Sequence, residues 1–458
     1  MIRRLLRGSE WRRDVLRTNL WVVPAIEVLA AVILFVITYS LDRAAYDGAF
    51  AVPGWAISGS ADVARTVLTA IAAAVITVVG VVFSIVLVAL TLTSTQFGPR
   101  MLRNFIRDRG TQLTLGTFVA TFVYAVLTLG SVGQGGHGDF VPHISVTMTL
   151  VLMVVDIAIL IYFLHHIAVQ IQLPQVIAGI AGDLQQAIAL QAGDETAGAG
   201  EDAQLKAEDT DLAAVVLASM EGPGGEVAAP RSGYLQYIEH GTLVEVAAQV
   251  NAVVHVLYRP GHFIVQGHPY VRVWPASAVG NVADELAGAH VTGPYRTLAQ
   301  DVSFGMDQLV EICIRALSAA VNDTFTALTC IDWIGDSLYK VTGRWQPTRV
   351  YRDGAGAVRV IATETTYARL VSRGFEKVRQ AGRGMPAVLI RQLDALARIM
   401  ERTTTTEDRQ LLLEQAAMIQ RLSEASVDEP RDREDVDRAY RAVLVAHADV
   451  TAGREISR

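Results

Sequence analysis

The chain has 458 residues, of which 51% are apolar and only 19% are charged, and its mean hydropathy is positive. A soluble domain usually carries about 25% charged residues, so this composition indicates a chain that is partly embedded in a membrane. The formal net charge is −7 and the acidic excess follows residue 170, which argues against nucleic acid as a partner. Only two cysteines are present, which argues against a disulfide framework and a thiolate zinc site.

Four apolar stretches are predicted to cross the membrane, because each is near or above the roughly 20 residues that a spanning helix needs. They occupy residues 20–41, 63–95, 113–131 and 144–167. The first is not expected to be a cleaved signal peptide, because its apolar core is too long. The sequence therefore predicts a four-helix transmembrane domain over 20–170, preceded by a basic N-terminus at 1–19.

Arginine is unevenly distributed over the segments that join these spans. The N-terminal segment contains six arginines and the loop at 96–112 contains four, whereas the loop at 42–62 has one and the loop at 132–143 has none. Arginine-rich loops stay on the cytoplasmic side of a membrane. We therefore expect a multi-pass protein of the bacterial plasma membrane with both termini in the cytoplasm.

The second span carries small or hydroxylated residues in a 4–3 rhythm from Thr66 to Ser94. Such a stripe lets helix backbones approach closely, and its hydroxyls can bond across the contact. It either packs against other spans of the same chain or lies at the symmetry axis of an oligomer, where it would line a pore. We expect a contact between protomers. The candidate pore or interface residues are Thr77, Gly80, Ser84, Thr91 and Ser94.

A basic segment follows this span, after Gly98-Pro99 ends or kinks the helix. Arg100, Arg103 and Arg107 fall on one helical face and are candidate contacts to lipid headgroups. The alternative is that these arginines only anchor the loop on the cytoplasmic side.

Asp156 lies near the middle of the fourth span. An aspartate at the bilayer centre costs at least about 2.5–3.5 kcal/mol, so such a residue usually has a role. We interpret Asp156 as a candidate ion or proton site, with a hydrogen-bonded or protonated core group as the alternative. Glu27 and the pair His165 and His166 are expected nearer the membrane interface.

Residues 171–230 are predicted to form a juxtamembrane segment and an acidic linker, because 191–230 contain nine acidic residues and one lysine. An acidic docking arm is the alternative. The remaining residues, 231–458, are predicted to form a cytoplasmic α+β domain with a helical C-terminal part. Its expected strands lie at 233–238, 252–259, 260–275 and 348–364, and its expected helices at 240–250, 300–342 and 366–448.

Four segments of the chain, 79–127, 142–168, 232–247 and 301–333, together resemble the DUF2254 family of predicted bacterial membrane proteins. The resemblance implies a multi-span membrane protein with a soluble C-terminal portion, and it implies no activity. Members of the family tend to have prolines flanking an Asn-Asp pair, where this chain has Ala319 and Thr324. A helix break at that pair is therefore less expected here.

The Asn-Asp pair itself, Asn322 and Asp323, is predicted either to cap a helix or to bind a ligand. Upstream, Asp307, Glu311 and Arg315 share a helix face and are expected to form an ion-pair ladder. No phosphate-binding loop, dinucleotide fingerprint, nucleophile elbow or zinc-protease motif is present in the sequence. We expect no enzyme activity, no cofactor and no metal site.

The sequence favours an oligomeric membrane protein of channel or transport type, whose cytoplasmic domain gates or assembles it. The partners expected are membrane lipids, further copies of the chain, and a small ion or a protein. The alternative is a non-conducting sensor or scaffold whose cytoplasmic domain binds a partner or a small ligand.

Overall fold

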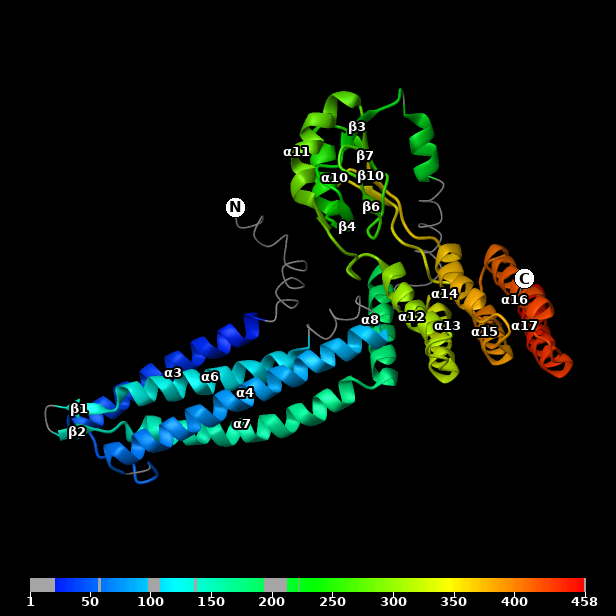
Figure 1. Ribbon diagram of the computed structural model, residues 1–458. Coiled ribbons are helices and arrows are strands. Elements are labelled where there is room, and N and C mark those ends of the chain that lie inside the picture. Colours follow the sequence, from blue (N-terminus) through cyan, green and yellow to red (C-terminus); the bar gives the residue numbers. More distant parts are fainter. Residues whose placement is uncertain are drawn as a thin grey trace. The chain divides into compact units, whose positions relative to one another are not determined.

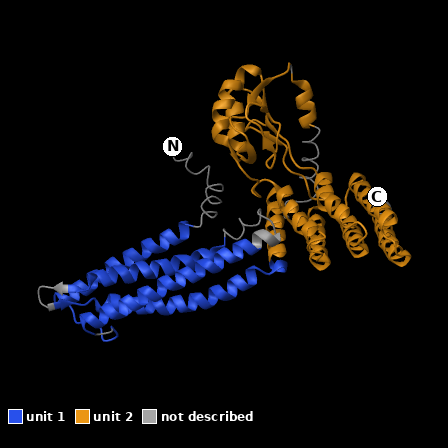
Figure 2. Cartoon of the chain, in the orientation of Figure 1, with its two compact units in different colours: residues 1–175 blue, residues 176–458 orange. Residues whose placement is uncertain are grey.

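The computed structural model of the chain describes residues 21–56, 59–97, 108–135, 138–192, 212–220 and 222–456. The chain divides into two compact units, Met1–Gln175 and Val176–Arg458 (Figure 2). Each unit is built from its own set of elements.

Among the described residues of the first unit, four long helices run side by side (Figure 1). All four are long and apolar enough to cross a membrane, with mean hydropathies of 1.8 to 2.9, which confirms the four predicted stretches to within five residues at each end. They are α3 (Val22–Tyr46), α4 (Ala61–Phe97), α6 (Arg109–Ser131) and α7 (His143–Gln170).

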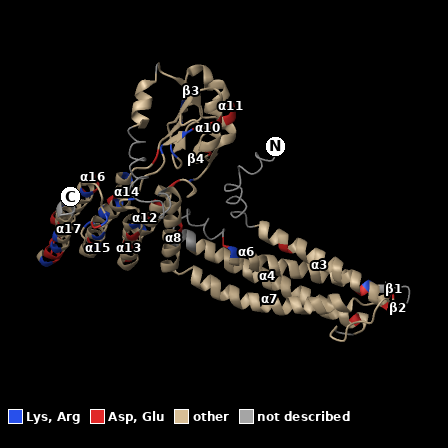
Figure 3. Cartoon of the chain, turned by 180° about the vertical axis from the view of Figure 1, so that it is seen from behind, with Lys and Arg blue, Asp and Glu red and all other residues tan. Residues whose placement is uncertain are grey.

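Helix α6 is the central helix of this bundle, because α3, α4 and α7 all pack against it. It is the least apolar of the four and the most buried, with buried hydroxyls at Thr114, Thr121 and Thr128. A short antiparallel hairpin of β1 (Gly133–Gly135) and β2 (Gly138–Phe140) joins it to α7. Figure 3 shows few charged residues along the bundle and many on the C-terminal helices.

The second unit begins with α8 (Leu173–Ala192) and contains two sheets. In the five-stranded sheet the order is β3-β7-β5-β10-β9, and only β5 and β10 are parallel; the three-stranded sheet has the order β6-β4-β8. The strands are β3 (Gly225–Ala228), β4 (Gly233–Ile238), β5 (Val253–Val256), β6 (Phe263–Ile264), β7 (Pro269–Trp274), β8 (His290–Gly293), β9 (Val350–Arg352) and β10 (Val358–Ala362).

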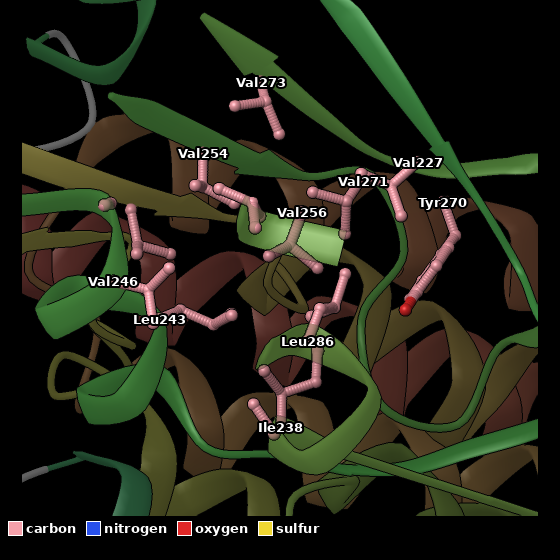
Figure 4. Close-up of a cluster of buried hydrophobic side chains, with 14 of the residues drawn as sticks. Val227, Ile238, Leu243, Val246, Val254, Val256, Tyr270, Val271, Val273 and Leu286 are labelled. Carbon is pink, nitrogen blue, oxygen red and sulfur yellow. The ribbon is translucent and has the colours of Figure 1, made fainter. Parts of the chain in front are cut away.

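Helices α10 (His240–Gln249) and α11 (Val279–Ala289) cover these strands, with the short 3-10 helix η2 (Ala276–Ala278) leading into α11. Alternating residues of β5 and β7 supply Val254, Val256, Val271 and Val273 to a core that the helices close with Leu243 and Leu286 (Figure 4). Period-2 burial of this kind is what the alternating sequence predicts.

Two features differ from the predicted boundaries of the second unit. Helix α8 occupies part of the segment predicted as juxtamembrane, and β3 lies inside 171–230 although it forms the edge of the large sheet. The α/β fold therefore begins before residue 231. The described part of the acidic stretch also contains a helical turn at 212–219, and most of the rest of that stretch falls outside the described residues.

The C-terminal part is helical, as predicted, and its helices pack on one another as successive layers. They are α12 (Val302–Ala316), α13 (Thr324–Val341), α14 (Tyr367–Ala381), α15 (Pro386–Met400), α16 (Thr406–Ser426) and α17 (Pro430–Ile456). The chain breaks between α12 and α13 without the family's prolines, because Asn322 adopts a left-handed conformation with φ 50° and Asp323 caps α13.

Candidate functional site

The small-residue stripe of α4 faces away from the rest of the bundle. Thr77, Gly80, Ser84 and Thr91 are exposed, whereas Val75, Val82 and Val86 on the opposite side of the helix are buried against its neighbours. At 100° per residue, Ser84 lies about 160° around the helix from Val82. Within the described part of the chain, Thr77, Gly80 and Ser84 therefore face away from the other helices of the bundle. Ser94 lies in α4, but its side chain is not among the described ones.

The hydroxyls of this stripe are satisfied within α4. Thr77 donates to the carbonyl of Ala73 at 2.7 Å, and Ser84 donates to that of Gly80 at 2.9 Å. A hydroxyl that donates to its own helix can still accept a hydrogen bond from a neighbour. Burying such a hydroxyl in an apolar helix contact therefore costs little free energy. Residues Thr77, Gly80, Val81, Ser84, Ile85 and Val88 line a groove of about 430 Å³ on this face. Arg100, Arg103 and Arg107 lie outside the described residues.

Asp156 is buried in the bundle, with 3% of its surface exposed. Its Oδ1 accepts a hydrogen bond of 3.1 Å from Thr121 Oγ1 of α6. Its Oδ2 is buried and has no hydrogen-bond partner among the described residues. A buried carboxylate oxygen without a donor is costly, so a proton or a cation has to accompany it.

Glu27 lies in a second polar position of the same bundle, about one and a half turns after the start of α3. Its side chain presses on Gly116 of α6, where an added Cβ would overlap Oε2 of Glu27 and lie 2.9 Å from Cα of Pro24. Oε2 is buried without a hydrogen-bond partner among the described residues. Nothing in the sequence pairs Glu27 with Gly116, because α6 contains several other small residues.

A polar cluster closes the end of the bundle at which α6 begins. Asp108 caps α6 by accepting from the backbone N–H of Thr111 at 2.7 Å. Its carboxylate also lies 3.0 Å from His166 Nε2 and accepts from Gln170 Nε2 at 2.6 Å. One acidic side chain therefore ties the start of α6 to the last turns of α7.

At the other end of the bundle, Asp42 of α3 caps a different helix. Its carboxylate accepts from the backbone N–H groups of Ile144 and Ser145 at 2.7 and 2.9 Å, and from the Ser145 hydroxyl at 2.7 Å. These N–H groups belong to the first turn of α7 and have no acceptor within the helix. The carboxylate therefore supplies their hydrogen bonds and places a negative charge at the positive end of the helix dipole. Nearby, Tyr124 and Thr38 share a hydrogen bond of 2.7 Å. Sequence reasoning missed Asp42, because it lies in what was predicted as a loop.

The second unit contains a partly open polar pocket between the end of α8 and the α/β fold, with a volume of about 160 Å³. His240 stacks on Tyr351 with ring centroids 4.3 Å apart, and its Nε2 is buried without a partner among the described residues. Burial lowers the pKa of His240 to about 4 and raises the pKa of Glu364 to about 7. The lining residues are Leu190, Gln191, His240, Pro260, Gln300, Pro347, Thr348, Tyr351 and Glu364.

Replacing Glu364 with glutamine is expected to stabilise the second unit increasingly as pH rises. The folded pKa of Glu364, about 7, lies above its ordinary value of 4.5. Its contribution to stability is therefore full below about pH 4.5 and is lost as pH rises through 7. Glutamine has no proton to lose, so the variant and the wild type should match near pH 5 and diverge by pH 8.

The native cysteines give a direct readout of this difference. Cys313 and Cys330 are the only cysteines in the chain, and both are buried in the second unit. Burial raises the pKa of the Cys313 thiol to about 12, so a thiol-reactive dye reports their exposure on unfolding. A melting-temperature difference between the two proteins that does not change from pH 5 to pH 8 would contradict the prediction.

The sequence-predicted polar groups of α12 and α13 are structural. Asp323 accepts from the backbone N–H of Thr326 at 3.1 Å and from its hydroxyl at 2.6 Å, and these bonds lower the pKa of Asp323. Asp307 binds Arg296 and Arg373. Asp307 therefore pairs with arginines outside α12, and not along the helix as the expected ion-pair ladder required. Among the described residues, no three metal-binding side chains lie together.

Comparison with known proteins identifies the family. The profile described as "Predicted membrane protein (DUF2254)" matches residues 17–398. Uncharacterised proteins of Mycobacterium tuberculosis and Mycobacterium bovis are 30% identical over 376 residues, which cover 81% of this chain and 70% of theirs. No solved structure matches the chain. The extent of these matches, together with the four apolar helices, shows that the chain belongs to the DUF2254 family of predicted membrane proteins.

Proposed function

We propose that the protein is a homo-oligomeric membrane transport protein, with Asp156 as the ion or proton site of each bundle. The observation that carries the transport function is the buried Oδ2 of Asp156, which lacks a hydrogen-bond donor about 20 Å from either end of α7. A charge at that depth is costly and is seldom kept without a role. The helix of Asp156 continues through a short turn at Ile171 and Gln172 into α8 of the second unit, which we assign a gating or assembly role.

The outward stripe of α4 supports the oligomeric part of the proposal. Small residues at heptad spacing permit close helix contact, and Thr77, Gly80 and Ser84 are exposed in the described part of the chain. An added Cβ on Gly80 meets nothing within 4 Å. A second α4 carries the same stripe, so two copies related by a twofold axis would be complementary along it. We therefore assign this face to a second copy of the chain.

The transport function is tested with purified full-length protein in liposomes that contain fluorescent indicators for H⁺, Na⁺, K⁺ and Cl⁻ in separate preparations. The proposal predicts that at least one ion crosses faster than in protein-free liposomes. A folded, correctly inserted protein that moves none of the four would contradict it.

The proposed orientation places the β1–β2 hairpin outside the cell and the second unit inside. A cysteine at the exposed position Asp139 should therefore react with an impermeant thiol reagent in intact cells, and one at the exposed position Ala442 of α17 should not. The buried native cysteines keep the background low. The reverse labelling pattern would overturn the orientation.

A sensor is the second candidate function, and the pocket of the second unit favours it. His240 Nε2 is buried and has no hydrogen-bond partner among the described residues, and Glu364 lines the same cavity, so a small polar ligand would find both a base and an acid. Leu190 and Gln191 of α8 also line the pocket. A ligand there would hold the end of the helix that follows the last span. A bound small molecule co-purifying with the wild type but not with His240→Phe would support this function.

A further inference from the structure

A row of polar side chains follows α6 through the first unit. Neighbouring helices place one polar side chain against α6 at each of four successive positions along its axis. The four α6 residues that they contact are separated by six, five and three residues. These intervals correspond to about 9, 7.5 and 4.5 Å along the helix axis. The pairs are His166 at Gly110, Glu27 at Gly116, Asp156 at Thr121 and Thr38 at Tyr124.

Two positions in this row are glycines, and each makes room for a titratable group. A Cβ on Gly110 would lie 2.5 Å from His166 Nε2, and one on Gly116 would overlap Glu27. Helix α6 is therefore shaped to hold an imidazole and a carboxyl against its backbone. The row ends near Asp108 on one side and near Asp42 on the other, so it reaches both ends of the bundle.

The surroundings of Asp156 fit a proton better than a metal cation. Among the described residues, Thr121 Oγ1 is its only hydrogen-bond partner. A hard cation takes several oxygen ligands, six or more in the case of calcium. A proton needs a single acceptor, and Oδ2 of Asp156 is buried and has no donor.

No cationic side chain among the described residues lies at the depth of Asp156. The three arginines on the three helices that pack against α7 all lie near helix ends, as do most of their other titratable groups. Glu27, Tyr39 and Tyr124 lie between one and two turns from a helix end. The full set on these helices is Glu27, Tyr39, Asp42, Arg43, Tyr46, Asp62, Arg65, Arg109 and Tyr124. Within α7 itself, His143 and the pair His165 and His166 also lie toward the ends, and Tyr162 stacks on His166.

We infer that the transported species is the proton, and that it passes inside each bundle along the polar row of α6 with Asp156 as the central relay. This inference rests on the proposed transport function and names its substrate. The Asp156 carboxylate accepts a proton from the side of Glu27, forming one O–H bond, and releases it toward Tyr124 and Thr38. The axial intervals of about 4.5 to 9 Å exceed a hydrogen bond, and Gly116 lies about 140° around α6 from Thr121, so the path from Glu27 to Asp156 requires a chain of water molecules around the helix.

The test measures proton entry into liposomes that contain full-length protein and a trapped pH-sensitive dye, with valinomycin and potassium to cancel the membrane potential. We expect Asp156→Asn to lower the proton flux at least tenfold and Glu27→Gln to lower it severalfold, because an amide cannot release and regain the proton. The control is Asp139→Asn on the exposed hairpin, which changes the same chemical group outside the row. Each variant is used only if it elutes from size exclusion at the wild-type position. The fluxes are compared between liposomes that contain equal amounts of protein.

The outcomes separate the two proposals. Proton flux that is lost in Asp156→Asn and kept in Asp139→Asn supports the inference. A wild type that moves sodium, potassium or chloride but no protons overturns the inference and leaves the transport function standing. Proton flux equal in wild type and Asp156→Asn also overturns the inference. A wild type that moves none of these ions overturns both.

Discussion

A leucine at Gly116 is expected to prevent the four-helix bundle from forming its native contacts. The added Cβ alone would overlap the Glu27 carboxyl and come within 2.9 Å of Cα of Pro24, which is backbone and cannot turn aside. Helix α3 would have to move away from α6 along its length. Overpacking of this kind costs about 3 kcal/mol or more, so we expect little monodisperse protein and a markedly lower melting temperature.

Gly80→Leu is the matched control, because it makes the same substitution in another bundle helix. Nothing lies within 4 Å of a Cβ on Gly80, so the chain should fold normally. The same substitution blocks the α4 stripe, so the particle should elute as a smaller assembly than the wild type. Equal melting temperatures for the Gly116→Leu and wild-type proteins would show that α3 does not pack on α6 as described.

Replacing Asp42 with alanine is expected to destabilise the bundle by about 3 kcal/mol. The substitution removes three hydrogen bonds at once and leaves two backbone donors of α7 unsatisfied in a buried position. An unsatisfied buried donor costs about 1–3 kcal/mol, and bonds to a charged group lie at the upper end of the range. The measurement is the thermal stability of the full-length protein in detergent, followed by loss of its size-exclusion peak.

Two further variants decide whether capping is the cause. Asp42→Asn keeps one acceptor oxygen and should recover part of the loss. Asp47→Ala removes an exposed carboxylate whose contact with Arg43, at 3.8 Å, contributes little. A loss for Asp47→Ala as large as that for Asp42→Ala would mean that the effect is general to this end of α3.

The four long apolar helices could be predicted from the sequence because their length and hydropathy alone indicate them. Lipid offers no hydrogen bonds, so any long apolar stretch must become a helix. The predicted span at 144–167 thus corresponds to α7 within three residues at each end. Strand β5 could be predicted equally well, because burial alternates along its residues, Val253 to Val256, as in a sheet with one buried face.

Contacts between elements could not be predicted. Sequence periodicity identifies which face of a helix makes a contact, but it does not identify the element that packs against that face. The α4 stripe was recognised as a contact surface, yet only the structure shows that it points out of the bundle. Asp156 was recognised as a buried acid, whereas its partner Thr121 and the related site at Glu27 and Gly116 depend on how α3 and α7 meet α6. Helix α8 was not predicted, because the composition of residues 173–192 is typical neither of a membrane span nor of a linker.

Disulfide trapping in native membranes tests most directly whether copies of this chain meet through the outward stripe of α4. Ser84→Cys lies on the stripe, and Phe83→Cys lies on the same turn, about 100° around the helix and also exposed. The two native cysteines are buried and do not compete. The account predicts a covalent dimer after mild oxidation for Ser84→Cys and none for Phe83→Cys. A Ser84→Cys protein that stays monomeric, or a dimer formed equally by both variants, would contradict it.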